Sequence, residues 1–254
     1  MRLNVFLQQA GVGSRREAER LVEQGRIKVN GAVAAPTTPV EEGDKVTLDD
    51  KPVSPAKRDL PRLFLLNKPL DVLVTTRDSQ NRQMVFDLPA FKKPGLPRLM
   101  SVGRLDVNSE GLLVLSDDGA LAQAMMSPSN ALERIYRVRI RGRFSERELA
   151  LLARGVTIEG IRYRGAQFEE ETDKGGRSNS WYRVVLTEGK NREIRRLVQH
   201  FGGVVNRLIR TQYGPFELGS IEPGELREVP PRAVMRLMET LEKKKAAKAE
   251  GDDA

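Results

Sequence analysis

Apolar residues recur at helical spacing from the start of the chain. One such face, which ends before Gly11, consists of Leu3, Phe6, Leu7 and Ala10. This spacing predicts a short amphipathic helix, because glycine commonly follows the last residue of a helix. A capping-box pattern formed by Ser14 and Glu17 predicts the start of a second helix, which stops at Gly25. The residues that this helix turns inward are Ala18, Leu21 and Val22.

Strand-like segments follow these two helices. Residues 27–29 and 45–48 are rich in apolar and β-branched side chains, and Asn30-Gly31 is typical of a tight turn. Together with the helices they predict a small helix–helix–sheet domain over residues 1–48. Residues 49–61 carry three prolines and little apolar content, so we expect a linker there.

The remainder of the chain mixes both kinds of periodicity. Strands are predicted at 63–66, 72–76, 111–116, 134–141, 182–187 and 204–210. Helices are predicted at 119–126, 145–154 and 190–201, the second with a capping box of Ser145 and Glu148. This mixture predicts an α+β domain over 62–235, with helices packed beside a mixed, mainly antiparallel sheet. The charged residues 236–254 lack aromatics and predict a helix end followed by a disordered tail.

Composition narrows the classes of function. The chain has 254 residues, and Lys plus Arg outnumber Asp plus Glu by 43 to 35, which favours a polyanionic partner. The absence of cysteine excludes disulfides, thiolate metal sites and cysteine nucleophiles, and it agrees with a reducing cytoplasm. His200 is the only histidine, which excludes a His-pair zinc site and argues against a Ser–His–Asp triad. We therefore expect a cytoplasmic protein without a metal. We also expect it to be a monomer.

Two further absences bear on membranes and nucleotides. No run of the sequence approaches the roughly 20 apolar residues of a membrane span. The segment GVGSRRE at 11–17 lacks a preceding strand and a third glycine, and EGKNRE at 188–193 is no Walker loop. We expect neither membrane association nor a nucleotide cofactor.

The most informative segment for chemistry is SVGRLDVNSEGLLVLSDDG at 101–119. Arg104 and Asp106 lie two residues apart, just after Gly103. A carboxylate in a glycine-assisted loop that faces a guanidinium is oriented and ionised as a nucleophile or electrostatic stabiliser requires. Taken alone, an aspartate beside glycine and asparagine is more often a turn former or a helix cap.

Its surroundings favour the chemical role. The segments GRLDVNSEGLLVLSDDG at 103–119, ERIYRVRI at 133–140 and LTEGKNREIRRL at 186–197 resemble the three sequence motifs of pseudouridine synthases of the RsuA/RluB type. The segment RLNVFLQQAGVGSRREAERLVEQGRIKVNG at 2–31 resembles the αL-like S4 RNA-binding domain that often precedes them. The matches follow the order of the family from about residue 2 to about residue 228. The resemblance implies isomerisation of uridine to pseudouridine in ribosomal RNA without a cofactor.

The resemblance also implies roles for particular residues. Asp106 acts beside the sugar or base, by attack on C1′, by addition to the pyrimidine ring or through a glycal. Tyr136 stacks on the flipped base and is a candidate for proton transfer. Arg104 enters the space that the base vacates. The resemblance alone does not separate Arg195 from Arg196, and the position of Arg195 on the helix predicted at 190–201 is what predicts its pairing with Asp106. On the apolar face of the same helix, Ile194 or Leu197 is expected to form the floor under the base.

Side-chain periodicity divides the arginines of the second and third motifs. Along 134–141 one strand face carries Tyr136, Val138 and Ile140, and the other carries Arg137, Arg139 and Arg141 as a phosphate track. On the helix predicted at 190–201, the apolar face consists of Ile194, Leu197, Val198 and Phe201. Arg192 and Arg196 project opposite this face, whereas Arg195 lies at its border, where a side chain reaches a cleft.

The residues expected to contact RNA are Arg15, Arg16, Arg20, Arg26, Lys28, Arg137, Arg139, Lys190, Arg192 and Arg196. NREIRRL and the segment VTTRDSQNRQMVFDLP at 74–89 resemble the large-subunit members of the family more closely, which favours 23S rRNA. One alternative is a non-catalytic rRNA-binding or ribosome-assembly protein with the same fold. Another is a carboxylate-pair glycosidase, with Glu110, Asp117 or Asp118 as the second acid.

Overall fold

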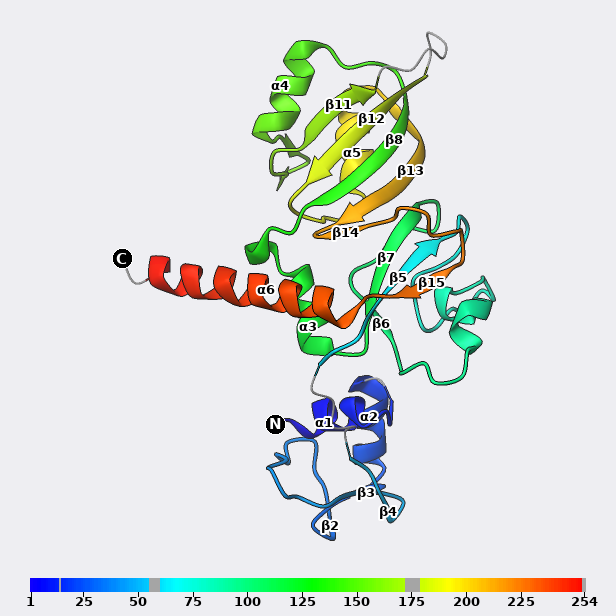
Figure 1. Ribbon diagram of the computed structural model, residues 1–254, viewed down its shortest axis with the longest axis vertical. Coiled ribbons are helices and arrows are strands. Elements are labelled where there is room, and N and C mark those ends of the chain that lie inside the picture. The colour runs from blue at the N-terminus through cyan, green and yellow to red at the C-terminus, as the bar shows by residue number, and fades with distance from the viewer. Residues whose placement is uncertain (14, 55–59, 172–178, 253–254) are drawn as a thin grey trace. The chain divides into compact units, whose positions relative to one another are not determined.

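The computed structural model describes residues 1–13, 15–54, 60–171 and 179–252. The chain divides into two compact units, residues 1–59 and 60–254 (Figure 1). Two helices and a small antiparallel sheet of order β2-β1-β3-β4 form the first unit. Its elements are α1 (Leu3–Gln9), α2 (Arg15–Glu23), β1 (Ile27–Val29), β2 (Ala32–Val33), β3 (Val46–Leu48) and β4 (Lys51–Pro52).

The first unit has an apolar core of its own. It contains most of the inward residues predicted for the two helices, among them Leu3, Leu7, Ala18 and Val22, but not Ala10, which follows the end of α1. The two predicted helices and two predicted strands are therefore confirmed, while Ser14 of the predicted capping box lies outside the described residues. The predicted linker begins too early: β4 pairs with β3, and Val53 N–H donates to Val46 O at 2.9 Å. Pro52 is tolerated because β4 is an edge strand.

The second unit is built on a mixed sheet. Its main path has the order β11-β12-β8-β13-β7-β5-β15, with β14 paired to β13 and β6 paired to β7. Among these pairs β13 and β7 are parallel and the others are antiparallel. The strands are β5 (Leu63–Lys68), β6 (Met100–Ser101), β7 (Glu110–Ser116), β8 (Arg134–Arg141), β11 (Gln167–Glu171), β12 (Asn179–Leu186), β13 (Val204–Tyr213), β14 (Phe216–Glu217) and β15 (Leu226–Glu228). A separate two-stranded sheet contains β9 (Thr157–Ile158) and β10 (Ile161–Arg162).

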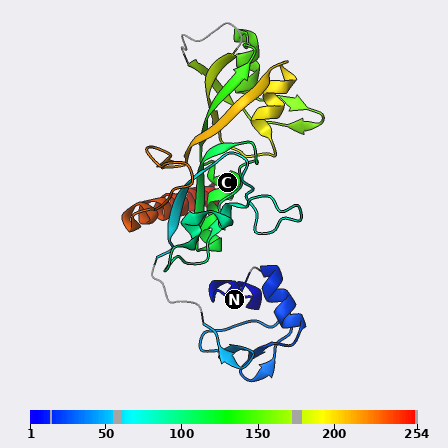
Figure 2. The ribbon, with the colours of Figure 1, turned by 90° about the vertical axis from the view of Figure 1, so that its right-hand side faces the viewer.

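Helices cover the sheet in two groups. The α-helices are α3 (Gly119–Met126), α4 (Glu146–Arg154), α5 (Glu193–His200) and α6 (Pro231–Asp252), and the short 3-10 helices are η1 (Val85–Asp87), η2 (Pro89–Lys92) and η3 (Pro128–Asn130). One core joins α4 and α5 to one face of β8, β12 and β13, and Figure 2 shows α5 on one side of these strands. The other core joins α3 and α6 to β5 and β7. None of the helices in the described residues is long and apolar enough to cross a membrane.

The junction of β7 and β13 requires a glycine. Gly111 has φ +98°, and a Cβ built there would lie 2.4 Å from the carbonyl oxygen of Arg210. Only a residue without a side chain permits this approach. The junction places the loop before β7 next to β8 and β13, which carry the second motif and part of the pocket.

Most of the elements predicted for the second unit form, and three predictions differ from the structure. The strands that were not predicted are β6, β9, β10, β11, β14 and β15. The helix predicted at 190–201 begins only at Glu193, because Arg192 adopts a left-handed conformation with φ 51°. The strand predicted at 72–76 does not form: Leu73 makes an isolated bridge with Met84, because β7 and β15 already occupy both edges of β5.

The predicted disordered tail is also wrong over the described residues, since α6 continues to Asp252. Its Leu237 and Leu241 pack into the core, beyond the predicted domain end at residue 235. The Lys-, Ala- and Glu-rich sequence that follows consists of strong helix formers, which extend the anchored helix.

Candidate active site

Asp106 lies in the loop between β6 and β7, at the edge of a pocket of about 840 Å³. Its side chain is 31% exposed. The loop is held from below by Lys68, whose buried ammonium donates to Pro69 O at 2.8 Å and to Ser109 O at 2.7 Å. Burial lowers the pKa of Lys68 to about 8. The carboxylate is therefore carried by a loop with a buried anchor.

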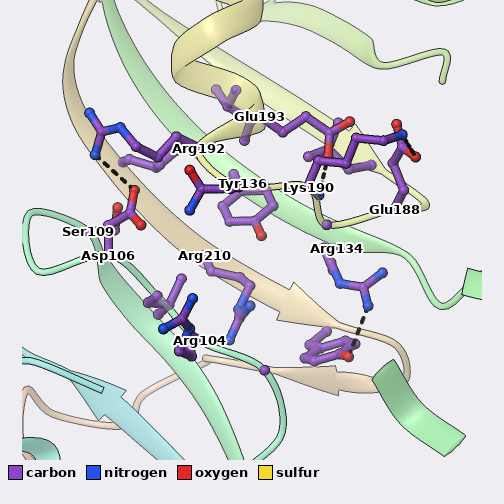
Figure 3. Close-up of a pocket in the computed structure, with 18 of the residues that line it drawn as sticks. Arg104, Asp106, Ser109, Arg134, Tyr136, Glu188, Lys190, Arg192, Glu193 and Arg210 are labelled. Atoms are coloured by element: carbon purple, nitrogen blue, oxygen red, sulfur yellow. Dashed lines mark hydrogen bonds and ion pairs between the residues drawn. The ribbon is translucent and has the colours of Figure 1, made fainter. Parts of the chain in front are cut away.

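Two arginines face Asp106, and the one nearer to its carboxylate is Arg192 rather than the predicted Arg195. Arg192 Nη1 donates to Asp106 Oδ2 at 3.2 Å, as Figure 3 shows. Arg195 Nε lies 4.0 Å from the same oxygen, while its Nη2 donates to Asn108 O at 2.8 Å. The prediction that Arg192 points away from the cleft is wrong, because the left-handed turn at residue 192 precedes the helix. The Arg195 side chain chiefly contacts the backbone of the loop that carries Asp106.

Tyr136 lies on β8 with its side chain in the pocket. It is 8% exposed, and the predicted alternation is confirmed, since Val138 and Ile140 are buried with it and the arginines of the other face are exposed. In Figure 3 its ring lies between Asp106 and Arg134. Ile194 also lines the pocket, whereas Leu197 is fully buried in the core and is not among the lining residues. The candidate floor of the pocket is thus Ile194.

A buried basic cluster at the pocket was missed by the sequence analysis. Arg134 and Arg210 are 7% and 3% exposed, and both guanidiniums lie over the ring of Tyr213, with Cζ at 4.7 and 5.1 Å from its centroid. Arg134 Nη2 donates to Tyr213 Oη at 3.0 Å. A signal for Arg134 was present: strand alternation puts residue 134 on the face of Tyr136. No comparable local signal marks Arg210.

An acidic pair, also missed, consists of Glu188, which precedes α5, and Glu193, the first residue of α5. Glu188 accepts from Arg164 N–H at 2.7 Å and from the ammonium of Lys190, while Glu193 accepts from Lys190 N–H at 2.9 Å. Burial, together with the charge of Glu188, raises the pKa of Glu193 to about 7. Burial opposes ionisation of Glu188, but the hydrogen bonds from Lys190 and Arg164 outweigh it and lower its pKa. Lys190 therefore lines the pocket and at the same time donates hydrogen bonds to both glutamates.

The acidic pair gives a pH prediction for stability. Because the pKa of Glu193 is higher in the folded than in the unfolded protein, its contribution is complete below about pH 4.5 and is lost as the pH rises towards 7. Glu193→Gln mimics the protonated acid and keeps the acceptor for Lys190 N–H. We expect the free energy of unfolding to fall less between pH 5 and 8 in this variant, by about 1–3 kcal/mol. Urea unfolding at four pH values measures this, and an unchanged pH dependence would contradict it.

The other predicted RNA contacts have mixed surroundings. Arg16, Arg20 and Arg139 are exposed, and the side chain of Arg15 is not among those that the structure describes. Ion pairs engage three others: Arg26 with Asp49, Lys28 with Asp50 at 2.6 Å, and Arg137 with Glu171 at 2.7 Å. Arg196 Nη1 donates to Tyr163 Oη at 3.2 Å, which differs from the free phosphate contact expected of it. Arg104 is exposed and lines the pocket near Asp106.

The three carboxylates considered as the second acid of a glycosidase all make structural ion pairs or hydrogen bonds. Glu110 pairs with Arg207 at 2.7 Å, Asp117 accepts from Arg62 N–H at 2.8 Å, and Asp118 caps α3 by accepting from Leu121 N–H at 2.7 Å. Within the described residues no three His, Cys, Asp or Glu side chains gather as a metal site would require. Glu188 and Glu193 also line the pocket, but they accept hydrogen bonds from Arg164 and Lys190. The arrangement thus supports chemistry centred on Asp106, beside an aromatic ring and several guanidiniums.

Comparison with known proteins identifies the class. Residues 62–200 match the family of RNA pseudouridylate synthases, and residues 1–46 match the S4 domain. The chain is 40% identical over 229 residues to an uncharacterized RNA pseudouridine synthase of Rickettsia felis, covering 90% of this chain and 96% of the relative. It is 44% identical over 225 residues to the ribosomal large subunit pseudouridine synthase B of Xanthomonas campestris pv. campestris, covering 85% of this chain and 44% of the relative.

A solved structure agrees with these matches. A crystal structure of a pseudouridylate synthase superimposes with a TM-score of 0.65 at 25% identity, covering 93% of this chain and 99% of the other. The chain therefore belongs to the RNA pseudouridylate synthase family, and it is an isomerase with an N-terminal S4 domain. The predicted family and the α+β fold class are confirmed. The roles of individual site residues stay predictions.

Proposed function

We propose that this enzyme converts a uridine of large-subunit ribosomal RNA into pseudouridine, with Asp106 as the group that acts beside the sugar. The observation that carries the proposal is that Asp106 and Tyr136 line the same pocket, with Arg192 and Arg195 next to the carboxylate. The volume of about 840 Å³ is sufficient for a nucleotide removed from its helix. The name of the Xanthomonas relative supports the large subunit as the target.

The reaction suits these residues. A uridine must leave the base stack, at a cost of a few kcal/mol, before the bond between uracil N1 and C1′ breaks and C5 takes its place. The ring of Tyr136 supplies a stacking surface for the extruded base. Asp106 supplies a negative charge beside C1′ or the pyrimidine ring. Arg104, exposed near the pocket, is placed to fill the position that the base leaves.

Mapping pseudouridines in ribosomal RNA from cells with and without the gene tests the proposal. We expect at least one pseudouridine of 23S rRNA to disappear, and to return when the purified enzyme acts on that RNA. Loss confined to 16S rRNA would contradict the target. An unchanged pseudouridine map would favour the non-catalytic assembly protein instead.

We further propose that the S4 domain anchors the RNA through α2. Arg16 and Arg20 are exposed one turn apart, and no ion pair among the described residues engages them, whereas Arg26 and Lys28 pair with aspartates. Replacing both Arg16 and Arg20 with Gln should weaken binding and reduce the slope of log Kd against log salt by about 0.7–0.9 for each lost contact. Filter binding at several salt concentrations measures the slope.

A control with the same loss of charge accompanies this prediction. Arg147 and Arg154 are exposed on α4, and their double replacement with Gln removes two charges from a face not assigned to RNA. We expect the control to keep the wild-type slope. An unchanged slope in the Arg16 and Arg20 variant, or an equal reduction in both, would reject α2 as the anchor.

A further inference from the structure

Arg210 is a buried cation in the pocket with few protein partners. It lies on β13, lines the pocket and is 3% exposed. Its Nε donates to Leu112 O at 2.7 Å, while Nη2 is buried without a hydrogen-bond partner. Within the described part of the chain no carboxylate lies within ion-pair distance of it. Most of the hydrogen-bonding capacity of the guanidinium is therefore unused.

Such an arrangement is costly unless a ligand completes it. A buried charge without a counter-ion costs several kcal/mol, and nearly all buried polar groups in proteins have partners. Arg210 is nevertheless kept in place by the ring of Tyr213, whose hydroxyl donates to Met125 O at 3.0 Å and accepts from Arg134. Two guanidiniums thus share this end of the pocket, and among the described residues neither of them makes an ion pair. The end is electropositive and prefers a negatively charged or strongly polar ligand.

The sheet register relates Arg210 to the stacking surface. Arg210 on β13 is the direct cross-strand partner of Tyr136 on β8. Direct partners in an antiparallel pair project to the same face, with Cβ atoms about 5 Å apart. Both side chains line the pocket, and Figure 3 shows Arg210 beside Tyr136 on the side away from α5. A planar base on the Tyr136 ring therefore has its edge within reach of the Arg210 guanidinium.

We propose that Arg210 is a further catalytic residue: its guanidinium binds a carbonyl oxygen of the extruded uracil and stabilises the negative charge that the ring acquires during cleavage. This rests on the proposed function. When the N1–C1′ bond breaks, its electron pair passes to the uracil and spreads over N1 and the carbonyl oxygens. C1′ receives an electron pair either from the Asp106 carboxylate, whose bond to C1′ breaks again when C5 attacks, or from the C2′–H bond, whose proton passes to Asp106 and returns to C2′ when C5 bonds to C1′. After C5 bonds to C1′, C5 loses a proton and N1 gains one, so no oxidant or reductant is consumed.

Arg210→Met tests the proposal because it removes the charge and keeps most of the side-chain length. In single-turnover reactions at saturating rRNA stem-loop, we expect the rate to fall about 100-fold or more. The Kd for the same RNA should stay within about threefold of wild type, because the interaction develops with the charge. Arg210→Lys should recover part of the rate. Arg147→Met, an exposed change on α4 with the same loss of charge, should match wild type.

A fluorinated substrate separates charge stabilisation from support of the fold. Fluorine at C5 withdraws electrons and makes the uracil a better anion, so less help is needed from Arg210. We expect the rate loss caused by Arg210→Met, measured as disappearance of the target base, to be at least about tenfold smaller for 5-fluorouridine. Equal losses with both substrates, or a loss confined to Kd, would overturn the proposal. If Arg210→Met does not fold, the same comparison with Arg210→Lys decides.

The outcome is distinguishable from failure of the proposed function. If wild-type enzyme forms pseudouridine in rRNA and Arg210→Met does so equally fast, only the role of Arg210 is wrong. If wild-type enzyme forms no pseudouridine in any rRNA, the proposed function itself is wrong.

Discussion

Asp106→Asn is expected to abolish pseudouridine formation while leaving RNA affinity within about threefold of wild type. The amide has the shape of the carboxylate but neither its charge nor its nucleophilicity. It still accepts a hydrogen bond from Arg192, which lies 3.2 Å away, so the loop and the pocket should keep their form. Single-turnover kinetics on a short rRNA stem-loop, with Kd measured on the same RNA, separate chemistry from binding.

Turnover by Asp106→Asn within tenfold of wild type would contradict the central role of Asp106. A matched control is Asp118→Asn, on the same motif but at the cap of α3, where the amide oxygen still accepts from Leu121 N–H. This control should keep wild-type turnover. Equal losses in the two variants would instead indicate a general effect on the fold.

Arg195→Met is expected to lower the rate of chemistry strongly, by about 100-fold or more, and Arg192→Met by only about tenfold or less. The difference follows from burial. The Arg195 side chain is 13% exposed and donates to Asn108 O and Val205 O, so its removal takes away two hydrogen bonds that hold the loop beside Asp106. Arg192 makes the shorter contact to Asp106, but its side chain is 46% exposed, where water and salt screen the pair.

Salt dependence distinguishes the two arginines further. The effect of Arg192→Met should shrink as salt rises, whereas that of Arg195→Met should persist. Single-turnover rates at saturating RNA and two salt concentrations measure both. Abolished chemistry in Arg192→Met together with a mild effect in Arg195→Met would show that the hydrogen bond to Asp106, rather than the support of its loop, is what the reaction needs.

Local patterns in the sequence were sufficient to predict several elements of the fold and the family of the protein. Alternation along β8 put Tyr136 on the buried face, and the Ser145–Glu148 capping box marked the start of α4. Both features depend on residues that are close together in the sequence, within one or two helical turns or a few residues of a strand. The spacing of residue types therefore predicts them directly. The three motifs and the S4-like segment were specific enough to indicate the family, because their order and spacing add to the match of each one.

What the tertiary structure decided involves partners distant in the chain. Arg192 was assigned to the wrong side because a helical wheel assumes that the helix has already begun, whereas a left-handed turn at residue 192 directs the side chain to Asp106, 86 residues away. In the sequence, nothing distinguishes Arg210 from other arginines on strands. In the structure, β13 pairs with β8 and β7, and the close approach at Gly111 buries Arg210 beside Tyr136. Burial and charge compensation depend on which strands become neighbours, and the energy of that pairing lies in contacts that no local window of sequence contains.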